Sequence, residues 1–272
     1  MNPTPQTTLA SGIELEGIGL HKGRPVKMRI EPAPPDTGVV FDLNGEKIPA
    51  NYAYAVVSAR NTTLTSGTGT EIYTVEHVLS ALYGMGVDNA LIFLDSDEPP
   101  ALDGSAGRIA SAIHTAGIAT LDRPASALVL SSPVVVHEKG ASVIFLPSPH
   151  FQAAYILDHT HPMIGTQAAF FNALGSTYSA DVAPARTFGL FDEVEALYAA
   201  GLALGGSIDN AVVVHQDRYS SALRFDNEFA RHKLLDLIGD VSLIGKRLCA
   251  RCIGIRSGHA LNIKAVSRLS EI

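Results

Sequence analysis

Three residues that can bind a metal or move a proton recur at four-residue steps in one apolar segment. His232, Asp236 and Asp240 lie in FDNEFARHKLLDLIGDVSLIG, residues 225–245. On an α-helix these steps place the side chains in one narrow polar stripe among leucines, isoleucines and valines. Burying an imidazole and two carboxylates there is costly unless they are paired, hydrogen-bonded or bound to a cation. The stripe therefore predicts that His232 and Asp236 are ligands of a divalent metal.

An ordinary helix can carry the same spacing as a solvated face or as a satisfied core pair. Two observations favour the metal. Asp240 continues the stripe by another turn, and Glu228, Arg231 and Lys233 already supply ordinary surface charge.

A metal site needs a further ligand, and the segment TVEHVLSAL, residues 74–82, offers one. Thr74 is predicted as the N-cap of a helix whose first turn contains Glu76 and His77. The positive end of the helix dipole favours a neutral, ligating imidazole at His77 and a carboxylate at Glu76 beside the metal. Glutamate also occurs in first turns simply because it stabilises helices, and the HExxH motif of many zinc hydrolases is absent.

The composition excludes several classes of protein. The chain has 272 residues, is 46% hydrophobic and carries a formal net charge of −7, with its 20 lysines and arginines scattered, so we expect no binding to nucleic acid. We also expect a cytoplasmic protein with no transmembrane segment, because no stretch approaches about 20 apolar residues and no signal peptide is recognisable. Cys249 and Cys252 are interpreted as ordinary thiols, because strand positions three apart face opposite sides.

The predicted elements form an α+β fold of two similar α/β-layered domains packed against each other, with the active site between them. LDRPAS, a short polar link with a proline, separates an N-terminal domain, residues 1–122, from a C-terminal domain, residues 126–272. In the first domain the pattern predicts strands at 26–30, 39–43 and 90–94, and helices at 75–83 and 106–115. In the second it predicts, besides the stripe helix, helices at 167–174 and 191–200, and strands at 127–136, 141–146, 152–158, 211–214, 249–255 and 260–266.

Motifs in family order over nearly the whole chain resemble the zinc-dependent UDP-3-O-acyl-N-acetylglucosamine deacetylases of lipid A biosynthesis. They are GIGLHKG (17–23), TVEHVLSAL (74–82), GVDNALI (86–92), ALDGSAG (101–107), ARTFGL (185–190), GLALGGSIDNAVVV (201–214), LRFDNEFARHKLLDLIGD (223–240) and SGHALN (257–262). The resemblance implies hydrolysis of the N-acetyl group of UDP-3-O-(3-hydroxyacyl)-N-acetylglucosamine, giving the free amine and acetate.

The resemblance also implies a set of roles around one Zn²⁺ ion. His77, His232 and Asp236 match the zinc ligands and leave a fourth position for water. Glu76 matches the general base that takes a proton from the attacking water. The N-terminal domain thus contributes Glu76 and His77, and the C-terminal domain contributes the other two ligands and His259.

Four further residues match roles beside the metal. His259 matches a general acid or cationic stabiliser, and Asp240 matches the carboxylate that orients this histidine and favours its protonated state. Thr187 matches a hydroxyl that donates to the tetrahedral oxyanion. Lys233 matches a substrate-binding lysine near the diphosphate.

In this family the fatty acyl chain lies in a hydrophobic passage built by an insert, which here corresponds to residues 188–214. The substrate contacts that we predict are Phe188, Gly189, Phe191, Ile208 and Thr63, and other candidates for the lining are Leu190, Val194 and Ala211. Plain core packing is the expectation for at least half of the insert's apolar side chains. The chain departs from the family at Ile208, often Phe, and at Thr63 and Thr65, often Met and Cys, which makes these surroundings smaller or more polar.

Two other functions stay open at this point. One is a zinc deacetylase of a related nucleotide sugar or glycan, and the other is a non-catalytic binding protein of the same fold. The complete set of base, acid and oxyanion donor argues against the second. His159 and His161 form an H-x-H pair that ranks below the main site as a metal chelator. The expected partner is the acylated UDP-sugar, and the expected oligomeric state is a monomer.

Overall fold

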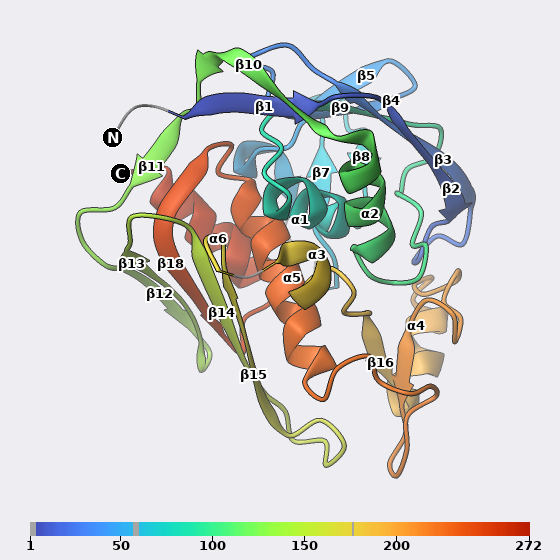
Figure 1. Cartoon of the computed structure of the whole chain (residues 1–272). Coiled ribbons are helices and arrows are strands. Elements are labelled where there is room, and N and C mark those ends of the chain that lie inside the picture. The colour runs from blue at the N-terminus through green and yellow to red at the C-terminus, as the bar shows by residue number, and fades with distance from the viewer. Residues whose placement is uncertain (1–3, 57–59, 176) are drawn as a thin grey trace.

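Helices packed between two large sheets make up the α+β fold of the chain (Figure 1). The computed structural model describes residues 4–56, 60–175 and 177–272. Among these residues, no helix is both long enough and apolar enough to cross a membrane.

The first large sheet has the strand order β2-β3-β9-β4-β5 and is antiparallel except for the parallel pair β4–β9. Its strands are β2 (Ile13–Ile18), β3 (Pro25–Pro32), β4 (Val39–Leu43), β5 (Glu46–Pro49) and β9 (Ala90–Leu94). Alternation along β3 buries Val26, Met28 and Ile30 on the face that packs toward the helices. Around this sheet lie α1 (Glu76–Gly84), α2 (Gly107–Ala116), the short strands β6 (Ala55–Val56), β7 (Thr63–Thr65) and β8 (Glu71–Ile72), and the paired strands β1 (Pro5–Leu9) and β10 (Ile118–Pro124).

The second large sheet has the order β12-β13-β18-β14-β15, with β11 pairing in parallel to β18. Its strands are β11 (Ala127–Val129), β12 (Val134–Glu138), β13 (Ala141–Pro147), β14 (Gln152–Asp158), β15 (Thr166–Asn172) and β18 (Arg247–Ile255). Helices α5 (Glu228–Ser242) and α6 (His259–Leu269) pack on one face of this sheet. Between β15 and α5 the chain forms α3 (Tyr178–Asp181) and the insert, which contains β16 (Phe188–Leu190), a 3-10 turn (Phe191–Glu193), α4 (Val194–Ala199) and β17 (Val212–Val214).

Helices α1 and α5 cross in close contact at the centre of the molecule (Figure 1). Gly239 makes this approach possible, because a Cβ atom on it would lie 2.2 Å from the carbonyl oxygen of Glu76. The contact therefore sets the first turn of α1 directly against the middle of α5.

Two predicted elements have the wrong secondary structure. Residues 167–174 were predicted to be helical, but β15 pairs with β14 over its whole length and buries Phe171 while leaving Phe170 exposed. Residues 260–266 were predicted to be a strand, but they lie in α6. In that segment Leu261, Ile263 and Ala265 alternate with polar residues, which mimics a strand pattern.

Other boundaries also differ from the prediction. The run 127–136 is two strands, because Ser131, Ser132 and Pro133 interrupt it and the two pieces pair with different partners. Thr74 does not cap α1: the N-cap is Val75, and the Thr74 hydroxyl donates to Glu98 Oε1 at 2.7 Å. The LDRPAS link lies partly within β10, which runs to Pro124. The division into domains 1–122 and 126–272 stays our proposal, and the two large sheets fall on either side of it.

Candidate metal centre and cavity

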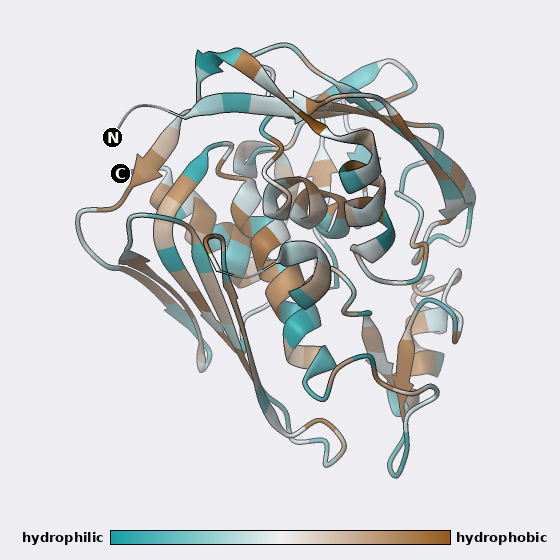
Figure 2. Ribbon diagram, viewed as in Figure 1, coloured by the Kyte–Doolittle hydropathy of each residue, from teal (hydrophilic) through white to brown (hydrophobic). Residues whose placement is uncertain are grey.

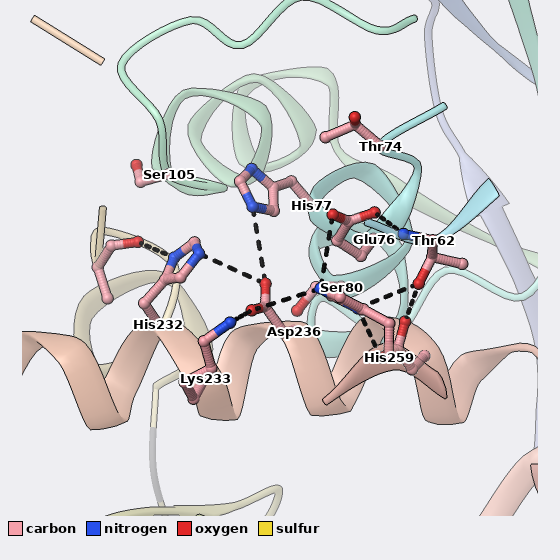
Figure 3. A network of polar contacts seen from close by, with 12 residues as sticks. Thr62, Thr74, Glu76, His77, Ser80, Ser105, His232, Lys233, Asp236 and His259 are labelled. Carbon is pink, nitrogen blue, oxygen red and sulfur yellow. Dashed lines mark hydrogen bonds and ion pairs between the residues drawn. The ribbon is translucent and has the colours of Figure 1, made fainter. Parts of the chain in front are cut away.

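Three potential ligands from α1 and α5 converge on one buried point (Figure 3). Asp236 Oδ1 lies 3.7 Å from His77 Nε2 and 3.5 Å from His232 Nε2. One ligand atom from each residue can be chosen so that all three lie within 4.8 Å of one another. Because His232 and Asp236 are one turn apart on α5, the helix presents them together, and the crossing at Gly239 brings His77 to them.

The atoms that face this point suit a divalent cation. Asp236 Oδ1 is buried and has no hydrogen-bond partner among the described residues, and an unpartnered buried carboxylate oxygen is costly without a cation. The Ala185 carbonyl lies 3.1 Å from His232 Nδ1, which puts the proton on Nδ1 and leaves the lone pair of Nε2 facing inward. Burial lowers the pKa of His77 to about 3 and also lowers that of His232, so both imidazoles are neutral and able to bind metal. Two imidazole nitrogens and one carboxylate oxygen are a donor set typical of catalytic zinc.

Lys233 forms an ion pair with the second carboxylate oxygen of Asp236. Its Nζ donates to Asp236 Oδ2 at 2.8 Å. Burial alone would raise the pKa of Asp236, but His232 and Lys233 outweigh it and hold that pKa well below its usual range. The Asp236 carboxylate in turn raises the pKa of Lys233 to about 12, against the opposing effect of burial. Asp236 is therefore ionised with one oxygen bound to an ammonium and the other available to a metal.

Glu76 lies beside the three ligands with one oxygen fixed and one free. Thr62 N donates to its Oε2 at 3.0 Å, while Oε1 faces His259 Nε2 at 3.9 Å. Burial raises the pKa of Glu76 to about 8, so that this carboxyl group exchanges its proton close to neutral pH. A dication at the neighbouring site would lower that pKa again by Coulomb attraction.

His259 begins α6 and is held by Asp240, the third member of the stripe. Its Nδ1 lies 2.9 Å from Asp240 Oδ2, which also accepts from Asn262 Nδ2 at 2.8 Å. Burial opposes a charge on His259, but the carboxylates of Asp240 and Glu76 outweigh it and raise the pKa to about 9. The histidine is therefore a cation at neutral pH, with Nε2 directed toward Glu76.

A cavity of about 360 Å³ opens over these residues. Its lining includes the three metal-binding candidates and most of the other residues that the sequence predicted, namely Glu76, Thr187, Phe188, Gly189, Ile208, Lys233 and His259. Val194 and Ala211 of the insert also line it, with Leu197 and Val213. Asp240 is not in the lining, because it lies behind His259 and is fully buried.

Two predicted substrate contacts lie elsewhere. Phe191 is 55% exposed and stacks on His215, with ring centroids 4.5 Å apart. Thr63 is buried, and its hydroxyl donates to Asn61 Oδ1 at 2.9 Å. Neither is among the described residues that line the cavity, nor is Leu190. Contact of Phe191 and Thr63 with the substrate stays a prediction.

Two residues that hold the site together were not predicted from the sequence. Thr62 bonds both to Glu76 and to the Asp240–His259 pair, but nothing in the sequence separated it from its neighbour Thr63. Arg186 forms a buried ion pair with Glu228, with Nε 2.8 Å from Oε1 and Nη2 3.1 Å from Oε2. This pair fastens the segment that carries the Ala185 carbonyl to the first turn of α5, one turn before His232. The position of Arg186 directly before Thr187 in ARTFGL was the available signal.

Comparison with known sequences gives one consistent family. Residues 6–271 match the profile of the family described as UDP-3-O-acyl N-acetylglycosamine deacetylase. A UDP-3-O-acyl-N-acetylglucosamine deacetylase of Syntrophus aciditrophicus (strain SB) is 40% identical over 271 residues, covering 98% of this chain and 86% of that protein. Proteins of the same name are 39% identical in Nautilia profundicola, covering 94% of this chain and 89% of that protein, and 36% identical in Leptospira biflexa, covering 94% and 86%.

Proposed function

Because the chain belongs to the UDP-3-O-acyl-N-acetylglucosamine deacetylase family, we propose that it hydrolyses the N-acetyl group of UDP-3-O-(3-hydroxyacyl)-N-acetylglucosamine. The products are the free amine and acetate, and the reaction belongs to lipid A biosynthesis. Zinc is the cofactor of this family, and His77, His232 and Asp236 would hold it. The observation that carries the proposal is the unpartnered, buried Asp236 Oδ1 between two neutral imidazoles at the base of the cavity.

The residues around this point divide the proton transfers between them. When bound, zinc acts as a Lewis acid that polarises the amide carbonyl and makes water more nucleophilic at neutral pH. Glu76 Oε1 accepts a proton from the water whose oxygen attacks the acetamide carbonyl carbon. His259, a cation at neutral pH, stabilises the negative charge that develops and gives its Nε2 proton to the amine as the C–N bond breaks.

Thr187 and Lys233 are proposed to act on the substrate from the cavity wall. Thr187 is a lining residue, and its backbone is fixed at both ends, since its N–H donates to Gly104 O at 2.8 Å and its carbonyl accepts from Val212 N at 2.9 Å. Such a fixed backbone can hold the hydroxyl as a donor to the oxyanion. The Lys233 ammonium, which donates to Asp236, is proposed to bind the substrate near its diphosphate.

The insert is proposed to bind the acyl chain. Figure 2 shows that its strands β16 and β17 are hydrophobic. Phe188, Val194, Leu197, Ala211 and Val213 line the cavity on this side, and Ile208, which is 65% exposed, lies at its edge. A fatty chain laid against these side chains would remove apolar surface from water on both partners.

The test is acetate release from the acylated UDP-sugar by the purified protein, before chelation, after chelation and after zinc is added back. Zinc-dependent release supports the reaction and the cofactor together. The same assay on UDP-N-acetylglucosamine without an acyl chain addresses the alternative, a deacetylase of a related nucleotide sugar or glycan. Equal rates on both substrates would favour that alternative over the proposed one.

We further propose that the protein is a cytoplasmic monomer. All the proposed catalytic residues come from one chain, so a second copy is not needed to complete the site. Light scattering on the protein as it elutes from a size-exclusion column would test the oligomeric state, and fractionation of cells would test the localisation.

A further inference from the structure

Thr62 contacts three helices at the point where the proposed base and acid meet (Figure 3). Its side chain is fully buried, directly before β7. Its N–H donates to Glu76 Oε2 at 3.0 Å, and its carbonyl accepts from Val75 N, the N-cap residue of α1, at 3.2 Å. The backbone of Thr62 therefore fixes the start of α1 and one oxygen of Glu76 together.

The side chain of Thr62 acts on the other two helices. Its hydroxyl donates to Asp240 Oδ1 on α5 and lies 3.2 Å from His259 Nδ1 on α6. An ionised carboxylate only accepts, so the single hydroxyl hydrogen goes to Asp240. Asp240 Oδ2 is thereby left to accept from His259 Nδ1 and Asn262 Nδ2. Both carboxylate oxygens are occupied, and the plane of the carboxylate is fixed.

This arrangement determines where the reactive atoms point. With Nδ1 bound to Asp240, His259 directs Nε2 to a position 3.9 Å from both Glu76 Oε1 and Asp236 Oδ2. With Oε2 bound to Thr62, Glu76 has only Oε1 free toward the cavity.

We propose that Thr62 is the positioning residue that holds the base Glu76 and the acid His259 in one mutual geometry for the reaction. This inference rests on the proposed function. It assigns Oε1 of Glu76 as the proton-accepting atom, and it assigns to the Thr62 hydroxyl the orientation of the Asp240–His259 pair. We expect zinc binding to be independent of the Thr62 hydroxyl, because this hydroxyl bonds to Asp240 and lies beside His259, and neither residue is one of the three ligands.

Two substitutions separate the hydroxyl from the shape of the side chain. Thr62→Val keeps the branched shape and the backbone N–H but removes the hydroxyl. Thr62→Ser keeps the hydroxyl. Thr8→Val is the matched control, because Thr8 is another buried threonine with a hydrogen-bonded hydroxyl. That hydroxyl donates to Asn89 O at 2.8 Å and accepts from Ala33 N at 2.9 Å, and none of these residues lines the cavity.

The experiment measures kcat, KM and zinc affinity for the three variants and the natural protein. We expect Thr62→Val to lower kcat roughly 10- to 100-fold, the range seen when outer partners of a site are removed, with KM and zinc affinity unchanged. Thr62→Ser should restore kcat to within about fivefold, and Thr8→Val should leave it unchanged. Proton NMR of the zinc-loaded protein supplies a readout without substrate, in which the signal of the His259 Nδ1 proton should shift in Thr62→Val and return in Thr62→Ser.

Three results would overturn the proposal: natural kcat in folded Thr62→Val, an equal loss in Thr62→Ser, or a loss of zinc affinity that matches the loss of kcat. If the natural protein releases no acetate, the proposed reaction has failed, yet the NMR comparison still decides the positioning role. An unchanged His259 signal in Thr62→Val would then refute it.

Discussion

Replacing Gly239 by alanine should separate the two helices that carry the metal ligands. The added Cβ would lie 2.2 Å from Glu76 O, and ordinary contact begins at 3.4 Å, so the first turn of α1 must move away from α5 by about 1 Å. That turn contains Glu76 and His77, whereas His232 and Asp236 stay on α5. A misplacement of about 1 Å can cost about 100-fold in rate. We expect a loss of kcat/KM of this size and zinc binding weakened at least 10-fold.

The assay combines acetate release, zinc competition with a chelator and thermal unfolding. Alanine favours a helix over glycine by about 1 kcal/mol, which offsets part of the roughly 1–3 kcal/mol cost of overpacking, so the variant should remain folded. Gly67→Ala is the control, because a Cβ there meets nothing within 4 Å. A folded Gly239→Ala protein with natural zinc affinity and rate would show that this contact does not set the spacing of the ligands.

Three further predictions follow from the geometry of the site. The rate should rise with pH as Glu76 loses its proton, at or below about pH 8, because the base acts deprotonated. It should fall as His259 loses its proton near pH 9, because the acid acts protonated. In His259→Ala the fall at high pH should vanish from the pH–rate profile. Arg186→Lys should weaken zinc binding about 10-fold in chelator competition, because the bidentate ion pair that holds the segment with the Ala185 carbonyl is lost. Arg247→Lys should not weaken it, although it alters another ion pair, in which Arg247 Nη2 lies 2.6 Å from Asp88 Oδ2. Ile208→Ala should raise KM for the acylated substrate about 5-fold and leave the non-acylated substrate unaffected, since less apolar surface contacts the chain.

Each of these predictions has a clear contrary result. A falling limb that persists in the His259 variant would remove this histidine from the role of acid. Equal zinc affinities in the two arginine variants would mean that the Ala185 carbonyl does not depend on the ion pair. A matching change in KM for both substrates would place Ile208 against the sugar rather than the acyl chain.

The sequence predicted the parts of the site that depend on local spacing. His232, Asp236 and Asp240 are one helical turn apart, so their common face follows from helix geometry alone. His77 was predicted as a further ligand from the segment TVEHVLSAL, and the resemblance implied the same role. The physical cause of its meeting with this face is a long-range contact at Gly239 that no local pattern encodes. Thr62 was missed for the same reason, because its partners lie on helices far along the chain.

Errors in the predicted elements arose where local pattern and tertiary pairing disagreed. The alanines of 167–174 favour a helix, but pairing with β14 and burial of Phe171 decide for a strand. In 260–266 the apolar residues fit both the two-residue period of a strand and the 3.6-residue period of a helix, since Leu261 and Ala265 are also four residues apart. Packing of α6 on the sheet selects the helix.

A zinc ion held between α1 and α5 would also be a cross-link within the fold. One ligand comes from the first third of the sequence and the other two from its last quarter, and an unfolded chain would not keep them together. Binding therefore favours the folded state, by about 2.7 kcal/mol when free zinc is 100 times the dissociation constant. As zinc becomes scarce, a larger fraction of molecules would open and become accessible to proteases. The lifetime of the protein in the cell would thus be coupled to the supply of the metal.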